Sequence, residues 1–179
     1  MTSDGAAGET GVKCASREPA CLSHVRVIGI GNEWRGDDAV GLLAARRLQE
    51  VLGNRAEVVE AGMAGVELLE LMKGAGAVLL IDAVRSGQAP GTIHRLDASA
   101  GPIAPALFPR STHAVGVAEM LELARTLGVL PKQVVVYGIE AGDTEAGHPL
   151  SPQVSHALNE VIELVRRETD ASPCTNSIS

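Results

Sequence analysis

The sequence predicts an α/β fold: a three-layer α/β/α sandwich with a mostly parallel, mixed five-stranded twisted sheet. Apolar runs typical of buried strands alternate along the chain with helical patterns, which favours helices on both faces of one sheet. Hydrophobic residues make up 45% of the chain and aromatic residues only 2%, so the core must be built from Val, Leu, Ile and Ala. A helix separates most of the predicted strands, and such crossovers connect parallel strands.

The strands and helices are predicted in a regular order. Strands are expected at residues 24–30 (HVRVIGI), 56–62 (AEVVEAG), 77–84 (AVLLIDAV), 91–96 (GTIHRL) and 133–140 (QVVVYGIE). Helices are expected at residues 38–52, 64–73, 113–128 and 152–168. The short segment RSGQAPG separates the third strand from the fourth, and a parallel crossover needs roughly a dozen residues. The fourth strand is therefore expected to run antiparallel.

The chain is expected to form one folded domain, residues 23–168. Its 179 residues fall within the usual size of a single domain. Residues 1–22 are rich in small and polar residues without periodicity, and residues 169–179 are polar, so both are predicted to be disordered tails. The three cysteines lie in these tails, at no spacing typical of a zinc site or a redox pair, and receive no role: Cys14, Cys21 and Cys174.

The charge of the chain limits its partners. The formal net charge is −7, which argues against affinity for nucleic-acid phosphates or for an anionic membrane surface. A cation or another protein is the expected partner. The sequence shows no apolar run of membrane-spanning length and no secretory signal at its start, so a cytoplasmic protein is predicted.

Acidic residues follow several of the predicted strands. In a mostly parallel sheet, ligands bind at the carboxyl ends of the strands, so residues at these positions are candidates for function. The acidic residues there are Asp37, Asp38, Glu60, Asp82, Glu140 and Asp143. An acidic rim of this kind favours a bound cation.

The loop GIGNEWRGDDAVG, residues 29–41, begins with the Gly-x-Gly pattern of a dinucleotide-binding loop. Trp34 stands where that motif needs its third glycine, and the paired aspartates would repel a pyrophosphate at the helix start. The glycines are instead expected to let the chain turn tightly from strand to helix. One aspartate suffices to cap the helix. Asp37 is the better candidate for a structural role, and Asp38 is expected to meet a metal ion.

Two further residues complete a candidate metal site. Asp82 ends a run predicted to be buried on both faces, where a charge needs a partner such as a cation. His113 is expected in the first turn of a helix capped by Ser111 or Thr112, where the helix dipole favours a neutral imidazole. Together with Asp38 they suit an open nickel or zinc site. The remaining histidines are assigned no role: His24, His94, His148 and His156.

Five segments resemble, in order, those of the hydrogenase maturation endopeptidases, which process the large subunit of nickel–iron hydrogenases. They are GIGNEWRGDDAVG, EAGMAGVELLELM, VLLIDAV, STHAVGVAEML and VVVYGIE, and the resemblance covers about residues 25–167. It implies a three-layer α/β/α fold and a catalytic, metal-contacting triad of Asp38, Asp82 and His113. It also implies that the segment AGMAG forms a loop at the same crevice.

The resemblance further implies an endopeptidase that removes the C-terminal peptide of the large-subunit precursor after nickel insertion. The nickel is expected to arrive with this substrate, and no permanent cofactor is expected. A held cation could polarise the scissile carbonyl, lower the pKa of a water molecule, or orient the precursor. Two other functions are a non-catalytic metal-binding assembly chaperone for the same precursor and a nucleotide-binding enzyme that uses Glu60. Trp34 is expected either to pack under its loop or to anchor the precursor.

Overall fold

The computed structural model describes residues 24–62, 65–101, 110–111 and 116–171. Several predictions concern residues outside these ranges. They include the disorder of residues 1–22 and of 172–179, the three cysteines, the placement of His113, and the centre of the AGMAG segment at residues 63–64.

One mixed sheet forms the middle layer of the described part of the chain, with the strand order β2-β1-β3-β6-β4. The strands are β1 (Val25–Ile30), β2 (Glu57–Ala61), β3 (Ala77–Arg85), β4 (Ile93–Asp97), β5 (Arg110–Ser111) and β6 (Gln133–Glu140). β1 pairs in parallel with β2 and β3, and β3 pairs in parallel with β6. β4 runs antiparallel to β6, as its short connection predicts. The two-residue β5, antiparallel to β3, was not predicted because so short a segment has no periodicity.

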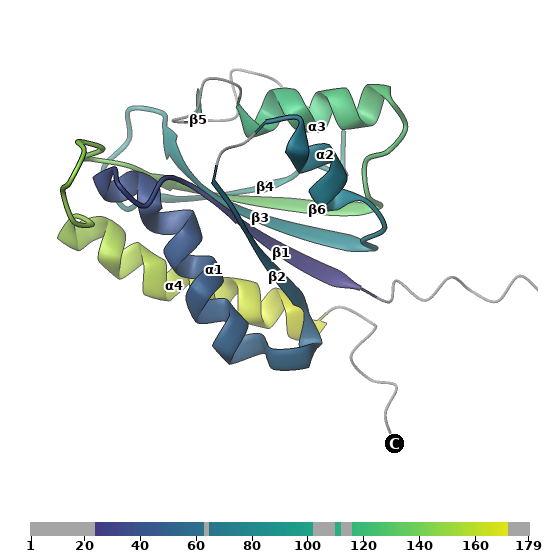
Figure 1. The fold of residues 1–179 in the computed structure, drawn as a ribbon, viewed down its shortest axis with the longest axis horizontal. Coiled ribbons are helices and arrows are strands. Elements are labelled where there is room, and N and C mark those ends of the chain that lie inside the picture. The colour runs from purple at the N-terminus through teal and green to yellow at the C-terminus, as the bar shows by residue number, and fades with distance from the viewer. Residues whose placement is uncertain (1–23, 63–64, 102–109, 112–115, 172–179) are drawn as a thin grey trace, which may run out of the picture.

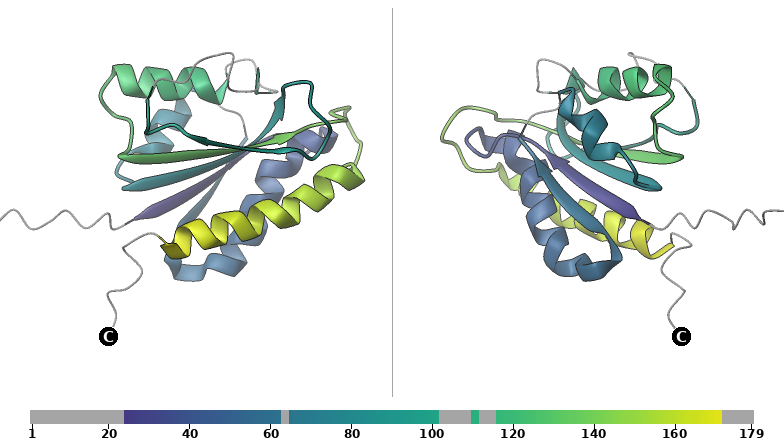
Figure 2. Two further views of the ribbon diagram at one scale, coloured as in Figure 1. Left: turned by 180° about the vertical axis from the view of Figure 1, so that it is seen from behind. Right: turned by 45° about the vertical axis from the view of Figure 1, so that its right-hand side comes forward.

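Helices cover both faces of this sheet, so the predicted three-layer sandwich is confirmed (Figures 1 and 2). The helices are α1 (Val40–Leu52), α2 (Glu67–Met72), α3 (Val117–Thr126) and α4 (Pro152–Ala171), with the short 3-10 helices η1 (Gly36–Ala39) and η2 (Gly53–Arg55). α1 and α4 lie on one face, and α2 and α3 lie on the other. Within the described residues, no helix is both long enough and apolar enough to cross a bilayer.

The core has two parts, one on each face of the sheet. Side chains alternate between the faces of a strand, so β3 contributes Leu79 and Ile81 to the α1 and α4 side, and Val78 and Leu80 to the other. Both parts consist mainly of aliphatic side chains, as the composition predicts. α4 continues to Ala171 rather than ending at residue 168.

Candidate active site

The start of α1 rests directly on the backbone of two strands. A Cβ atom at Gly41 would lie 2.1 Å from the carbonyl oxygen of Ile30 and 2.4 Å from that of Ile81, which is too close for any side chain. At Gly31, a Cβ atom would lie 2.2 Å from the carbonyl oxygen of Asp38. These two glycines therefore permit close backbone contact rather than the predicted tight turn. Of the glycines in this loop, Gly36 has the positive φ, 49°, that a turn requires.

This contact brings the elements that carry Asp38 and Asp82 together. Asp38 lies in η1, directly before α1, and η1 contacts β3. Asp82 follows Ile81 in β3 and shares its face with Val78 and Leu80. Both carboxylates are buried, with exposed fractions of 4% and 0%. The predicted burial of Asp82 is confirmed, although β3 continues beyond it to Arg85.

The third predicted residue, His113, lies outside the described residues. The described chain on either side of it belongs to β5 and α3. Ser111 of β5 pairs with Val84, two residues after Asp82 in β3. The helix α3 begins at Val117 with Gly116 as its N-cap, so the predicted capping of this helix by Ser111 or Thr112 is wrong. The structure thus places two of the three predicted site residues near the carboxyl-terminal ends of the parallel strands. The position of His113 stays a prediction.

Asp37 has the structural role that the sequence favours for it, but through different contacts from those expected. Neither η1 nor α1 has a side-chain cap. The Asp37 carboxylate instead accepts hydrogen bonds from the backbone N–H groups of Gly142 (2.8 Å), Asp143 (2.9 Å) and Ser151 (2.7 Å). It also accepts one from the Ser151 hydroxyl at 3.0 Å. Asp37 therefore fixes the loop that follows β6, residues 141–151, against η1.

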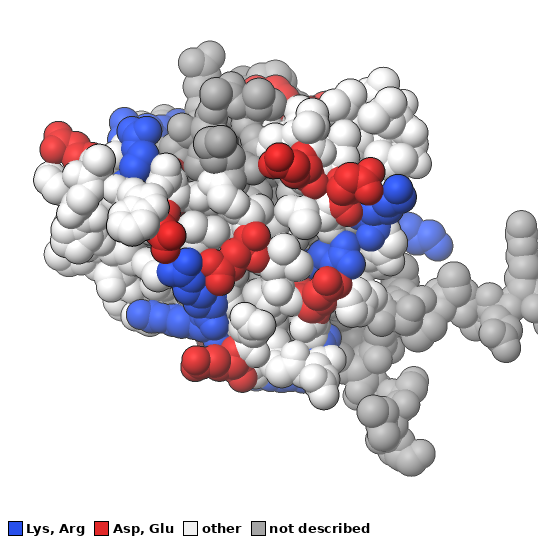
Figure 3. Space-filling view, in the orientation of Figure 1, with Lys and Arg blue, Asp and Glu red and all other residues white. Residues whose placement is uncertain are grey.

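Glu60 takes part in a surface ion-pair network. Arg46 donates to Glu60 at 2.9 Å and to Glu33 at 3.1 Å, and all three side chains are exposed. Figure 3 shows basic and acidic side chains side by side on this face rather than in separate patches. The acidic rim is thus partly neutralised at β2. The engagement of Glu60 with Arg46 also disfavours the nucleotide-binding hypothesis, which needs this carboxylate for a ribose.

Glu140, the last residue of β6, is a buried carboxylate with many donors around it. It accepts hydrogen bonds from the N–H groups of Ser86 and Gly87, from the Ser86 hydroxyl at 2.7 Å, and from His94 at 3.3 Å. Burial raises the pKa of Glu140, but the hydrogen bonds from Ser86, Gly87 and His94 outweigh it and hold the pKa below its ordinary value. Glu140 thus joins the ends of β3 and β6 in its ionised form.

The variant Glu140→Gln is expected to lower the free energy of unfolding at neutral pH by about 2 kcal/mol, because an amide cannot satisfy all of these donors. The stabilisation by Glu140 is present above the ordinary pKa of a glutamate, near 4.5, because its folded-state pKa is lower. It is lost as the pH falls through that folded-state value. Urea unfolding of both proteins at about pH 7 and about pH 3 should therefore show a difference that shrinks in acid.

The exposed Glu50 on α1 provides the control for this experiment. Glu50→Gln is expected to leave the free energy of unfolding unchanged at both pH values. A stability difference for Glu140→Gln that grows in acid would contradict the role of the ionised carboxylate.

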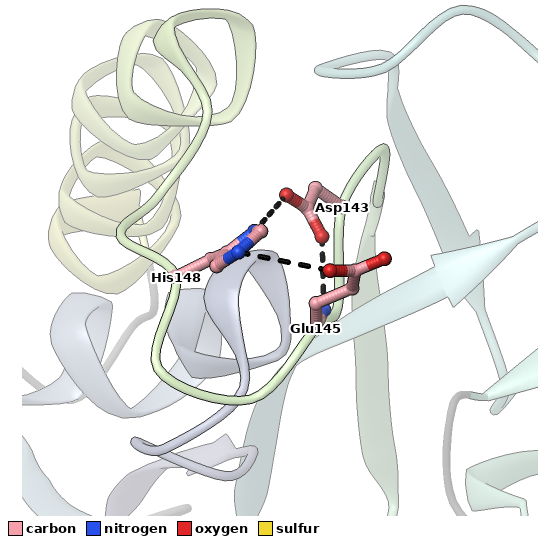
Figure 4. Close-up of side chains that lie close together, drawn as sticks. All are labelled: Asp143, Glu145 and His148. Atoms are coloured by element: carbon pink, nitrogen blue, oxygen red, sulfur yellow. Dashed lines mark hydrogen bonds and ion pairs between the residues drawn. The ribbon is translucent and has the colours of Figure 1, made fainter.

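A surface pocket of about 640 Å³ opens near the carboxyl-terminal ends of β3 and β6. It is lined by Arg35, Arg85 and residues 142–146. Beside it, the loop after β6 brings together three side chains that sequence reasoning did not group: Asp143, Glu145 and His148 (Figure 4). His148 was assigned no role because its place in the sequence lacks a setting comparable to that of His113. The spacing Asp-x-Glu-x-x-His directly after a strand was the available signal.

Sequence comparisons relate the chain to hydrogenase maturation proteins. A family model described as hydrogenase maturation protease matches residues 42–168. The chain is 31% identical over 147 residues to the hydrogenase 2 maturation protease of Escherichia coli K12, covering 79% of this chain and 88% of that protein. It is 29% identical over 144 residues to the hydrogenase expression/formation protein HupD of Thiocapsa roseopersicina. That match covers 79% of this chain but 65% of HupD, less than two thirds of its length.

Solved structures give a matching result. The hydrogenase maturating endopeptidase HybD from Escherichia coli superposes with a TM-score of 0.68 at 27% identity, covering 84% of this chain and 94% of that structure. The solution structure of an endopeptidase from Escherichia coli gives a TM-score of 0.71 at 28% identity, covering 83% and 94% of the two chains. The described α/β/α sandwich is therefore an architecture that these proteins share.

Proposed function

Because the chain belongs to the hydrogenase maturation protease family, we propose that it is the endopeptidase that removes the C-terminal peptide of a nickel–iron hydrogenase large-subunit precursor after nickel insertion. Membership of this family, and with it the protease class, agrees with the resemblance seen in the sequence. The reaction is proposed to take place in the cytoplasm. The observation that carries the proposal is the pair of buried carboxylates, Asp38 and Asp82, on the contacting elements η1 and β3.

The nickel ion belongs to the substrate in this proposal, and the chain holds no permanent cofactor. Asp38, Asp82 and His113 are proposed to contact it, since two carboxylates and one imidazole suit a borderline divalent cation and leave coordination positions for the precursor's own ligands. The bound ion supplies positive charge at the scissile region. The residues of the chain orient the precursor, because the absence of a side chain at Gly41 lets the start of α1, next to Asp38, lie directly against the backbone of β1 and β3. Orientation of this kind lowers the entropic part of the barrier.

The test is to incubate the full chain with large-subunit precursor in nickel-loaded and nickel-free forms, and to measure the mass of the precursor. Release of a C-terminal peptide from the loaded form, and much slower release from the nickel-free form, is the expected result. Equal cleavage of both forms would overturn the recognition of nickel. Stable binding without any mass change would identify the assembly chaperone instead.

Trp34 is proposed to anchor the precursor beside this site. Its side chain is 73% exposed, so it does not pack under its loop. Its backbone is nevertheless fixed, because its N–H group donates to Oδ1 of Asn32 at 3.0 Å and its carbonyl accepts from Gly147 at 2.8 Å. An exposed Trp on a fixed backbone binds a partner with little loss of conformational entropy, and Trp is enriched among the residues that dominate interfaces.

The variant Trp34→Ala is expected to raise the KM for the precursor about 10-fold or more while leaving the melting temperature unchanged. Steady-state kinetics and thermal unfolding measure the two quantities. Leu127→Ala is the matched control. Leu127 is also exposed, at 58%, but it lies between α3 and β6, at the end of the sheet where the parallel strands begin. Equal KM values for wild type and Trp34→Ala would exclude the anchor.

A further inference from the structure

The loop after β6 carries a cluster of potential metal ligands that the proposed protease function does not use. Asp143, Glu145 and His148 point toward one another in Figure 4, and each offers a ligand atom that lies within 4.8 Å of the others. Asp143 and Glu145 also line the 640 Å³ pocket, so an ion held by this cluster would sit at the pocket's rim. The cluster is thus a separate place at which the chain presents metal-binding chemistry.

The backbone of this loop is held in place from several sides. Asp37 fixes it through its carboxylate, and the Asp37 N–H group also donates to the carbonyl of Asp143 at 2.7 Å. Arg35 donates to the carbonyl of Thr144 at 3.2 Å, and Arg85 donates to the Thr144 hydroxyl. Because the backbone between the ligands is already ordered, binding an ion requires little more than rotation of three exposed side chains.

The charges in the cluster favour a cation. The His148 Nδ1 atom lies 2.6 Å from Oδ2 of Asp143, and its Nε2 atom lies 3.6 Å from Oε2 of Glu145. The imidazole thus lies between two carboxylates. A divalent cation held between these two carboxylates would neutralise their negative charge.

We propose that Asp143, Glu145 and His148 form a binding site for a borderline divalent cation such as Zn²⁺ or Ni²⁺. Two carboxylate oxygens and an imidazole nitrogen are the mixed ligands that these ions accept, whereas Mg²⁺ and Ca²⁺ prefer oxygen ligands alone. Three protein ligands leave coordination positions toward the pocket for water or for a side chain of a bound protein. The site does not depend on the proposed protease function.

Isothermal titration with Zn²⁺ alone tests the site in the full-length protein. The wild type is expected to bind Zn²⁺ with a dissociation constant in the micromolar range. His148→Ala is expected to bind one Zn²⁺ ion fewer per protein chain. Glu145→Gln is expected to weaken Zn²⁺ binding at this site about 10-fold or more. Loss of a residue that only hydrogen-bonds a metal ligand already has an effect of about this size, and Glu145 is proposed to be a ligand itself. Since the Glu145 side chain is 78% exposed, this second variant separates loss of a ligand from collapse of the loop.

Two histidine variants identify which site the ion occupies. His156→Ala removes an exposed histidine on α4 and is expected to bind Zn²⁺ as the wild type does. His113→Ala, which changes the proposed processing site, is expected to retain the equivalent that His148→Ala loses. Absence of Zn²⁺ binding by the wild type, or identical binding by wild type and His148→Ala, would overturn the proposal. Neither result bears on precursor cleavage, which is measured separately.

Discussion

Asp38→Asn and Asp82→Asn are each expected to slow precursor processing by at least about 100-fold, the effect of removing a ligand that orients a metal-bearing substrate. Asparagine keeps the size of the side chain but removes the negative charge that would face nickel. Both carboxylates are buried, so solvent cannot replace the lost interaction. The rate of peptide release from nickel-loaded precursor, measured by mass spectrometry, gives the result directly.

Folding and charge are controlled separately in this experiment. Circular dichroism and thermal unfolding show whether each variant keeps the native structure. Glu60→Gln also removes a carboxylate near the carboxyl-terminal end of a parallel strand, but this carboxylate is exposed and pairs with Arg46. The Glu60→Gln protein is expected to process the precursor at the wild-type rate. A folded Asp38→Asn protein that still cleaves at the wild-type rate would show that this acid does not act in the site.

Gly41→Ala is expected to destabilise the fold by about 2 kcal/mol or more, the usual effect of forcing an extra carbon into a packed contact. Two effects oppose each other at this position. Alanine favours a helix over glycine by about 1 kcal/mol. Its Cβ atom, however, would lie 2.1 Å and 2.4 Å from the carbonyl oxygens of Ile30 and Ile81, and these belong to central strands that cannot move aside cheaply. The clash is therefore expected to win.

Thermal unfolding measures this effect, with an expected fall in melting temperature of about 5 °C or more. Gly62→Ala is the matched control, because a Cβ atom at Gly62 would meet no atom within 4 Å. The Gly41→Ala protein that remains folded is also expected to process precursor more slowly, since displacing α1 from β3 separates Asp38 from Asp82. An unchanged melting temperature would show that the helix start can shift without cost.

The layered fold could be predicted from local patterns because the order of apolar and polar residues within a short segment indicates which of its faces are buried. The run AVLLIDAV is apolar at successive positions, which indicates a strand covered on both faces, and β3 is such a strand. The direction of β4 followed from the length of one connection. By the same reasoning Asp82 was recognised as a buried carboxylate before its neighbours were known.

Contacts between distant segments could not be predicted in this way. The aspartates 37 and 38 are adjacent and chemically identical, yet Asp37 accepts hydrogen bonds from residues more than 100 positions later in the chain. The same loop brings His148 to Asp143 and Glu145, although no periodicity marks these residues. The sequence position of Glu60 is that expected of a ribose-binding acid, but in the folded chain Glu60 forms an ion pair with Arg46.

The sequence by itself therefore determined the layers, the direction of the strands and the family, and it singled out Asp38 and Asp82 as candidate site residues, because side-chain periodicity and short motifs are local properties of the chain. Only the tertiary structure decided what each acid contacts, and which glycines serve a turn and which serve contact between backbones. These depend on the distance between segments after folding. At Gly41 that distance leaves no room for a single methyl group, and the absence of a side chain there lets α1 and the preceding η1, with Asp38, lie against the strand that carries Asp82.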